Sequence, residues 1–544
     1  MRIGRVEGTF RPTADAKCAE ASGGMVATAF PEATNAGVEM LAQGGNAIDA
    51  ACAVGFALGV CEPQASGLGG QTMGLVHFDG RTFAVDGSSR APSLAHRSQL
   101  AEPHARRVGY RATTVPSTPA TYGWLHRQYG RLDWHTVLGP AIRIARDGYR
   151  ITQLQHGLQA RERESFFKVP SHSGARYFLN PTGEPRAVGS RFTQPELAGV
   201  LELVAAQGVE AFYRGDIADQ IHADMAANDG LLQADDLALI PWPVERRPLA
   251  RRYRGYLIKT MPLPGSGRTL LLVLLMLHHL KSAFVGGRAP ERYHFLAETF
   301  RKAFLQRQDL PFDPNSYPQR RDKPMLSRRF AQDLAASIAD EMDVHLPLED
   351  PEGAEVGETT HFSLMDRDGN TATMTQSIEL VYGSKAAADG LGFLYNNYMM
   401  AFELENPAHP YYLRPNAVPW SSVTPSIVFR RKQPWLATGS PGSERIFSAV
   451  TQFLVAVLDG SAPISAAVDE PRIHCSIGGR VSYEAGRIAP EVVSYLERLG
   501  YVLAPREPYA FYLGCVQAVL RRQTGSGFQG VADPRRDGVA QGPV

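Results

Sequence analysis

The 544-residue sequence predicts a mixed α/β protein with a helix-rich first part and a strand-rich second part. Three observations support this prediction. Before about residue 357, long segments carry the composition and periodicity of helices. After that point, short β-prone runs alternate with glycines and tight turns. Apolar residues make up 44% of the chain and charged residues 20%, which suits a globular protein of several domain-sized units or one large composite domain.

Helices are expected where helix formers run between stop signals. The first spans Pro31 to Leu41 and stops at Gly44-Gly45, and a helix of small residues spans Ala47 to Val60. The apolar run from Leu270 to Leu277 is too short to cross a bilayer and predicts a buried helix. The other expected helices are Thr121 to Tyr129, Trp134 to Asp147, Gln194 to Ala206, Asp216 to Ala227, Pro290 to Gln306, Ala331 to Asp343, Phe447 to Asp459 and Pro490 to Leu499.

Glycine and proline mark the connections between these segments. Asp79-Gly80 lies between two short β-prone runs, Val76 to Phe78 and Thr82 to Val85, and predicts a hairpin. The proline-dotted segment from Pro311 to Pro324 predicts an irregular loop. The last residues, Asp533 to Val544, are expected to form a frayed end.

Charge and cysteine content exclude several classes of protein. The formal net charge is +1, so no general attraction to nucleic acid or to an anionic membrane is expected. Five scattered cysteines without a CxxC pair favour neither a zinc ribbon nor a disulfide framework, and predict buried or idle thiols in a reducing compartment. No apolar segment follows the basic residues near Met1, so no signal peptide is visible and a cytoplasmic location is expected.

The segment from Thr359 to Ser377 predicts a β-hairpin. Two β-prone runs flank Arg367-Asp368-Gly369, and a glycine at the end of a three-residue loop takes the left-handed conformation without strain. If Asp366 faces Asn370, partner numbers sum to 736 along the hairpin, and Thr359 then faces Ser377. Register alone therefore predicts that two hydroxyl groups meet, unless a bulge intervenes. From the hairpin alone, a threonine-rich surface hairpin is the simpler interpretation, because β-sheets favour threonine.

A series of motifs changes that interpretation. The run Thr359-Thr360-His361-Phe362-Ser363, followed by Asp366-Arg367-Asp368-Gly369-Asn370, resembles the start of the small subunit in the γ-glutamyltranspeptidase family. Further segments resemble the family in the family's own order. They are Ala33 to Asp49, Ser66 to Gly70, Val115 to Pro119, Ala145 to Gly148, Phe212 to Gly215, Met261 to Pro264, Leu394 to Asn397, Trp420 to Pro425 and Gly439 to Gly442.

This resemblance implies a fold and a way of working. The implied fold is the four-layer αββα sandwich of N-terminal-nucleophile hydrolases. The family makes a precursor that cuts its own chain, here at the Glu358–Thr359 bond. The pieces would be a large (α) subunit, 1–358, and a small (β) subunit, 359–544, which together form one composite domain. They would stay together as a heterodimer, and a dimer of such heterodimers is one assembly that the resemblance allows. No cofactor or metal is implied.

The resemblance also assigns roles to individual residues. The new α-amino group of Thr359 would be the general base for its own hydroxyl, since a free α-amine has a pKa of about 8. Ser377 occupies the position of a supporting family threonine. Gly442 and Ser443 match the backbone pair of the oxyanion hole, where the family usually has two glycines. Ser421 and Ser422 match the serines that contact the substrate α-carboxylate.

Departures from the family pattern concern the substrate. Ser88 stands where the family has its carboxylate-binding arginine, and Arg90 lies two places later. Ala401 replaces the aspartate that grips the substrate amine, while Glu379 could still bind an amine. Tyr398, with Met400, suggests a more apolar or aromatic rim. We therefore expect an amide or related acyl substrate other than a standard γ-glutamyl compound. A true γ-glutamyltransferase or glutathione hydrolase, a carbon–carbon bond hydrolase of natural-product biosynthesis and an inactive scaffold remain alternatives.

Other candidate sites fit their chemistry less well. Ser440 does not lie in a clean nucleophile-elbow pattern, and Gly265-Ser266-Gly267 is too short for a phosphate loop and predicts a turn into the next helix. His474 and Cys475 are adjacent, so on a strand they would point to opposite faces. His278-His279 suits a helix surface, since no third metal ligand is evident. His361 is expected to be structural.

Overall fold

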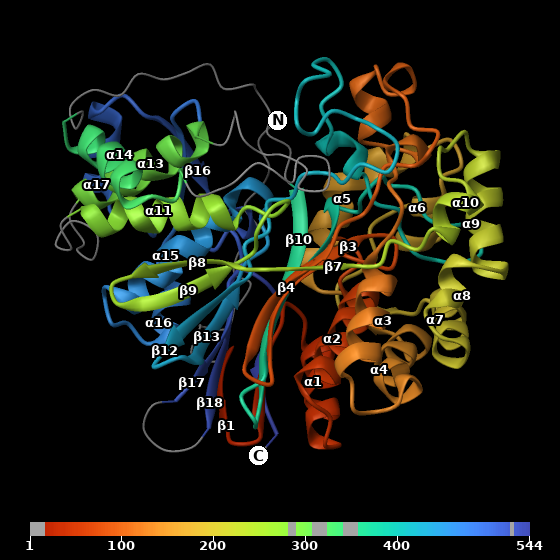
Figure 1. Ribbon diagram of the computed structural model, residues 1–544. Helices are drawn as coiled ribbons and strands as arrows, with labels where there is room; N and C mark the ends of the chain where they lie inside the picture. Colours follow the sequence, from red (N-terminus) through yellow and green to blue (C-terminus); the bar gives the residue numbers. More distant parts are fainter. Residues whose placement is uncertain (1–16, 281–289, 307–323, 341–356, 523–526, 544) are drawn as a thin grey trace.

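Two seven-stranded antiparallel sheets lie face to face in the computed structural model, which describes residues 17–280, 290–306, 324–340, 357–522 and 527–543 (Figure 1). The first sheet has the order β1 (Cys18–Ala21), β18 (Phe528–Ala532), β17 (Gln517–Arg521), β13 (Gln433–Gly439), β12 (Ser426–Arg430), β9 (Tyr256–Thr260) and β8 (Leu249–Tyr253). The second has the order β19 (Ala540–Gln541), β2 (Gly24–Ala27), β10 (Gly357–Asp366), β11 (Thr371–Leu380), β3 (Gln71–Phe78), β4 (Arg81–Gly87) and β7 (Val244–Arg246).

A layer of helices covers the outer face of each sheet, as Figure 1 shows. One apolar cluster joins the β10–β11 sheet to its helices, which include α1 (Pro31–Ala42), α2 (Ala47–Cys61), α3 (Thr118–Tyr129), α4 (Trp134–Asp147), α5 (Gln153–Phe167) and α7 (Pro195–Gln207). A second cluster joins the other sheet to α11 (Gly267–His279), α13 (Pro290–Leu305), α14 (Arg328–Asp340), α15 (Ile446–Leu458) and α17 (Pro490–Arg498). The expected four-layer αββα sandwich is confirmed.

Smaller elements complete the fold. A three-stranded sheet contains β14 (Ile473–Cys475), β15 (Arg480–Glu484) and β16 (Val502–Arg506), and β5 (Tyr149–Arg150) pairs with β6 (Arg191–Phe192). Helix α9 (Asp216–Ala227) and the short helices α6 (Ser173–Phe178), α8 (Glu210–Tyr213), α10 (Ala234–Ala238) and α16 (Ile464–Asp469) are also present.

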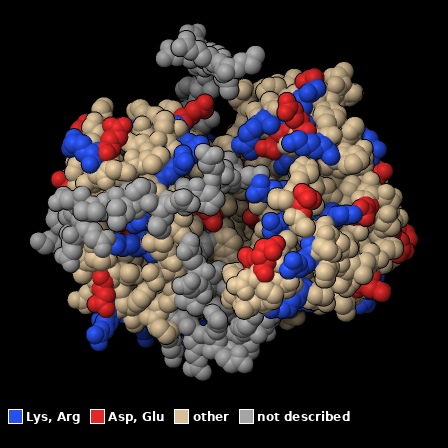
Figure 2. Space-filling view, turned by 90° about the horizontal axis from the view of Figure 1, so that it is seen from above, with Lys and Arg blue, Asp and Glu red and all other residues tan. Residues whose placement is uncertain are grey.

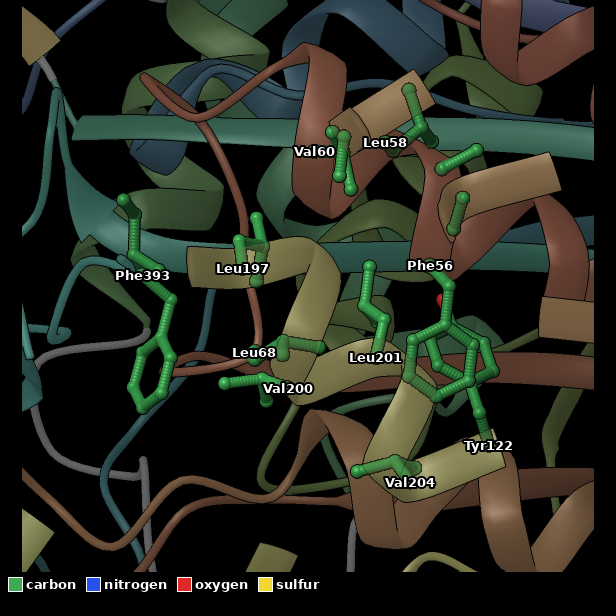
Figure 3. Close-up of a cluster of buried hydrophobic side chains, with 14 of the residues drawn as sticks. Phe56, Leu58, Val60, Leu68, Tyr122, Leu197, Val200, Leu201, Val204 and Phe393 are labelled. Carbon is green, nitrogen blue, oxygen red and sulfur yellow. The ribbon is translucent and has the colours of Figure 1, made fainter. Parts of the chain in front are cut away.

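Helix α2 is fully buried because its small residues allow close packing. Asn46 caps its first turn by accepting from the N–H groups of Ile48 and Asp49. A Cβ atom on Gly55 would lie 2.1 Å from the ring of Tyr122, so glycine is required there. Figure 3 shows part of the surrounding core, in which Leu201 and Val204 of α7 lie beside Phe56 and Tyr122.

Most expected helices are present near their expected bounds, and Trp134–Asp147 and Asp216–Ala227 match at both ends. Helix α11 extends the apolar run Leu270 to Leu277 by three residues at its start and two at its end, and the expected turn at Gly265 to Gly267 leads into it. The hairpin at Asp79-Gly80 is confirmed, with φ values of 47° and 75°. Helix α5 was not expected. Residues 311–323 of the expected proline-rich loop lie outside the described residues.

The expectation of a frayed C-terminus is wrong. Within Asp533 to Val544, β19 pairs with β2. Buried ion pairs fix the chain before it: Asp533 pairs with Arg472, and Arg535 pairs with Asp533 at 3.1 Å and with Glu484 at 2.6 Å. Partners distant in sequence therefore order this segment, so its local composition could not reveal them.

The chain on either side of Glu358 contributes strands to both sheets. Strands β2 and β3, which flank the β10–β11 pair, come from before Glu358, and β8 and β9 complete the sheet that holds β12 and β13. Four of the five free cysteines are buried, and Cys18 is half-buried. None of the described helices combines the length and the apolar character needed to cross a bilayer.

Candidate active site

The β10–β11 hairpin keeps the predicted register over most of its length. Thr360 faces Gln376, whose numbers sum to 736, but Glu358 faces Glu379, one residue out of that register. Thr359 is therefore opposed by both Ser377 and Ile378, which form a β-bulge. The N–H of Ile378 donates to the carbonyl of Ala65 at 3.3 Å. The bulge thus occurs at the end of the hairpin that carries Thr359.

The two hydroxyls meet in spite of the bulge. Thr359 Oγ1 donates to Ser377 Oγ at 3.2 Å, and Ser377 Oγ donates to the carbonyl oxygen of Glu358 at 2.9 Å. Ser377 Oγ also accepts from the N–H of Glu379 at 2.9 Å. The serine hydroxyl therefore connects the Thr359 hydroxyl to the carbonyl of the peptide bond that precedes it.

The side chain of Glu358 is buried and turns back toward the same peptide bond. Its Oε1 accepts from the N–H of Thr359 at 3.0 Å and pairs with Arg536. Arg536 pairs in turn with Glu62 Oε1 at 2.6 Å. Burial raises the pKa of Glu62, and the nearby Arg536 opposes this rise.

Glu379 and Tyr398 border Ser377 on its other side. Burial raises the pKa of Glu379 to about 7, while a hydrogen bond from Tyr398 lowers it and the charge of Glu444 raises it. The backbone of Glu379 has a φ of 80°, in the left-handed region. Gln71 lies opposite Ser377 on β3 and accepts from the Ser89 N–H at 2.9 Å.

The expected oxyanion pair lies against the start of β10. Gly442 has a φ of 128° and Ser443 a φ of 52°, so the serine holds a left-handed conformation that glycine adopts more easily. A Cβ atom on Gly357 would lie 2.6 Å from Ser443 Cβ, which places Ser443 beside the residue two before Thr359. Within the described chain, neither N–H of this pair is used in a hydrogen bond.

The three serines that were expected to contact the substrate lie in different settings. Ser421 is buried, its N–H donates to Pro264, and its carbonyl accepts from Ser266. Ser422 is half-buried. Ser88 donates its hydroxyl to Asp86. None of these three serines hydrogen-bonds to Thr359 in the part of the chain that the structure describes.

The charged partners expected from the family are absent at the two altered positions. Arg90 is half-buried, and its carbonyl accepts from the Val115 N–H at 2.8 Å. Its guanidinium pairs with no group in the part of the chain that the structure describes. Ala401 ends the short 3₁₀ helix η5 (Tyr398–Ala401) and is also half-buried. The structure therefore places no carboxylate at position 401 and no guanidinium at position 88.

The alternative nucleophiles are held in structural contacts. Ser440 Oγ donates to the carbonyl of Pro441 at 2.7 Å and accepts from the Cys515 N–H. His474 contacts Ser448 Oγ at 2.9 Å, whereas Cys475 lies in the apolar core. His278 and His279 lie at the exposed end of α11. No cluster of potential metal ligands occurs among the described residues.

His361 lies in a buried polar network between the sheets. Its Nδ1 contacts Thr375 Oγ1 at 2.8 Å, and its Nε2 contacts the hydroxyls of Ser363 and Thr373, each at 3.1 Å. Burial lowers the pKa of His361 to about 3, so the ring is neutral near pH 7. The filled hydrogen-bonding capacity suits the structural role expected for His361.

Sequence reasoning missed three buried residues around Thr359: Glu62, Gln71 and Arg536. They come from the end of α2, the start of β3 and the segment before β19. None carries a local pattern that marks it as part of a site, although Gln71 directly follows the glycine-rich turn.

On the face shown in Figure 2, acidic and basic residues are interspersed and the surface is hollowed near its centre.

Comparisons with known proteins agree over nearly the whole chain. The family model described as Gamma-glutamyltranspeptidase matches residues 33–542. Glutathione hydrolase proenzyme of Escherichia coli (strain K12) is 31% identical, over 98% of this chain and 93% of its own length. Acylase ACY 1 proenzyme of Pseudomonas sp. (strain V22) is 32% identical, over 85% of this chain and 84% of its own. The crystal structure of cephalosporin acylase from Bacillus halodurans superposes with a TM-score of 0.88 at 27% identity, covering 100% of this chain and 99% of that chain. The chain therefore belongs to the γ-glutamyltranspeptidase family and is an enzyme of the N-terminal-nucleophile hydrolase or transferase type.

Proposed function

We propose that the chain is a proenzyme that cuts its own Glu358–Thr359 bond and then uses Thr359 to attack an amide or related acyl bond. The observation that carries this proposal is the hydrogen-bonded series from Thr359 Oγ1 through Ser377 Oγ to the carbonyl oxygen of Glu358. Thr359 is only 5% exposed in the uncut chain, which suits an inactive precursor. The relatives from Escherichia coli and Pseudomonas sp. (strain V22) are called proenzymes, which supports a cleaved, two-subunit form.

Self-cleavage uses groups already in contact. Thr359 Oγ1 attacks the carbonyl carbon of Glu358, and the Ser377 hydroxyl donates to the oxygen on which negative charge builds. The C–N bond then breaks, and the nitrogen of Thr359 takes up the proton that Oγ1 has lost. Water hydrolyses the resulting ester between Glu358 and Oγ1, which leaves a free hydroxyl and a free α-amine on Thr359.

The processed enzyme repeats this chemistry on an external substrate. The α-amine of Thr359 takes the proton from Oγ1, which attacks the substrate carbonyl. The N–H groups of Gly442 and Ser443 stabilise the charge on the carbonyl oxygen. The C–N bond of the substrate then breaks, and the amine leaves with the proton that the α-amino group has taken up. Water or an amine acceptor resolves the acyl-enzyme and returns the hydroxyl of Thr359, with Ser377 supporting the nucleophile throughout.

We further propose that the preferred acyl group is not a standard γ-glutamyl group. Ser88 and Ala401 supply neither the guanidinium nor the carboxylate that would grip a free amino-acid head. Ser421, Ser422, Tyr398 and Glu379 would line the remaining acyl site. A second candidate, a true glutathione hydrolase, is favoured by the relative in Escherichia coli and by the carboxyl group of Glu379.

Expression of the intact chain and of Thr359→Ala tests the proposal. Scaling the 59.4 kDa chain by residue share gives pieces of about 39 and about 20 kDa for average composition. Mass spectrometry should find Thr359 at the new N-terminus, and Thr359→Ala should stay a single chain because alanine has no hydroxyl. Efficient cleavage of Thr359→Ala at the same bond would contradict the mechanism. A panel of amides, with products identified by mass, then defines the acyl group.

The assembly and location of the enzyme belong to the same proposal. The two pieces remain together as a heterodimer, since each sheet contains strands from both, and this heterodimer can pair with a second copy. We place it in the cytoplasm. Light scattering of the processed protein tests the assembly, and fractionation of the source cells tests the location.

A further inference from the structure

Two adjacent arginines near the C-terminus serve different parts of the molecule. Arg535 is bound by Glu484 and Asp533, in the network that orders the chain after β18. Arg536 instead reaches the start of β10, where its two terminal nitrogens pair with Glu62 and with Glu358. The mechanism above gives this second arginine no role.

The ion pairs of Arg536 with Glu62 and Glu358 are almost completely buried. The side chains of Arg536, Glu62 and Glu358 are each 2% exposed. Charged side chains are almost never buried this deeply without partners, and removing one partner leaves the others desolvated. The guanidinium fork suits two carboxylates because it presents separate N–H donors in a fixed plane. Arg536 thus holds Glu358 and Glu62 in one rigid arrangement.

This arrangement fixes the peptide bond that is to be cut. Glu358 Oε1 accepts both from Arg536 and from the N–H of Thr359 at 3.0 Å, so the side chain folds back over its own peptide. The carbonyl oxygen of the same residue is held by Ser377 at 2.9 Å. The scissile peptide is therefore anchored at its oxygen by a hydroxyl and at its nitrogen by a clamped carboxylate.

The clamp itself rests on well-anchored backbone. The carbonyl of Arg536 accepts from the ammonium group of buried Lys17. The backbone N–H of Arg536 donates to the carbonyl of Asp533 at 3.3 Å. Glu62 caps the C-terminal end of α2, where its N–H donates to Leu58 at 2.9 Å. Segments from near both ends of the chain therefore converge on the residue before Thr359.

We propose that Arg536, supported by Glu62, is a positioning residue for self-cleavage that acts by clamping the side chain of Glu358. The inference rests on the proposed self-cleavage. Attack by Thr359 Oγ1 on the Glu358 carbonyl carbon closes a small ring. The rate of this attack therefore depends on how closely the orientation of the peptide plane is fixed. The clamp restricts that plane and neutralises the carboxylate beside a carbonyl that is about to gain negative charge.

The test is a time course of cleavage in cell-free synthesis. The chain is pulse-labelled during synthesis, and the uncut and cut forms are separated on a denaturing gel. Arg536→Gln removes the ion pairs to Glu62 and Glu358, and loss of the contact to Glu358 should slow cleavage by about 10- to 100-fold. Arg536→Lys, which keeps the charge and loses the fork, should recover part of the rate. Glu358→Asp keeps the carboxylate and shortens its reach, so it should also be slow. Arg254→Gln, which removes an arginine paired with Asp459 at 2.8 Å elsewhere, is the matched control.

A double-mutant cycle separates positioning from simple loss of structure. If Arg536 acts through Glu358, Arg536→Gln should add no slowing in a Glu358→Ala background. Thermal melts of the same substitutions on Thr359→Ala measure stability without cleavage. Equal rates for the wild type and Arg536→Gln, or additive effects in the cycle, would overturn the inference and leave the proposed function standing. A wild-type chain that is never cut at Glu358–Thr359 would overturn both.

Discussion

Removal of the Ser377 hydroxyl should affect self-cleavage more than any other change of one atom near Thr359. That oxygen takes part in three hydrogen bonds, two of 2.9 Å and one of 3.2 Å. In Ser377→Ala the buried N–H of Glu379 and carbonyl of Glu358 lose their partner, at a cost of about 1–3 kcal/mol for each unsatisfied group. The folded precursor should therefore lose roughly 2–6 kcal/mol of stability.

The effect on the rate comes mainly from one of these bonds. The bond to the Glu358 carbonyl strengthens as the oxygen gains charge, so its loss should slow cleavage by about 100-fold. Pulse-labelled synthesis followed on a denaturing gel measures the rate, and urea unfolding on a Thr359→Ala background measures the stability. Ser377→Thr, which keeps the hydroxyl, is the control and should be cut at close to the wild-type rate. If folded Ser377→Ala is cut within twofold of the wild-type rate, the serine has no part in the reaction.

Three further predictions concern neighbouring groups. Ser443→Gly should stabilise the Thr359→Ala protein by about 1 kcal/mol, because it relieves a φ of 52°; a lower melting temperature would refute this. Burial raises the pKa of Glu379 to about 7, so the folded state keeps a proton that the unfolded chain loses near pH 4.5. The contribution of this proton to the free energy of unfolding is therefore complete below pH 4.5 and falls as the pH rises through 7. Urea unfolding at pH 5 and pH 8 should show that Glu379→Gln removes this dependence, and an unchanged dependence would refute the assignment. A γ-glutamyl anilide should be a poor substrate, and Ser88→Arg combined with Ala401→Asp should raise turnover efficiency by roughly two to four orders of magnitude; family-level activity in the unmodified enzyme would identify an ordinary glutathione hydrolase.

The hairpin shows how far the sequence could predict the site. The turn at Arg367-Asp368-Gly369 fixes the register, and period-2 pairing then carries it as far as Thr360 and Gln376. Local rules stop there, because the bulge depends on the left-handed Glu379 and on an N–H of Ile378 that bonds to a loop after α2. The contact between the two hydroxyls survives because Ser377 is one of the two bulge residues that lie opposite Thr359.

The ionic contacts could not be predicted in the same way. Helices such as α4 and α9 follow from periodicity and stop signals within one window of sequence. Arg536 and Glu62 are 474 positions apart, and only the folded chain brings them together. The C-terminal segment looks like a loose end for the same reason, since its polar residues are satisfied by partners that no short window contains.

The mixing of strands from both sides of Glu358 in each sheet has a consequence for how the protein can fold and refold. While the chain is intact, a covalent tether keeps the two sets of strands at a high effective concentration, and assembly of the sheets is a first-order process. If the bond before Thr359 is cut as proposed, neither piece alone contains all the neighbours of its strands. Recovery from denaturant then becomes a second-order encounter whose yield falls with dilution. The tether is needed once, so a cut protein that unfolds is expected to be replaced by new synthesis more readily than it is repaired.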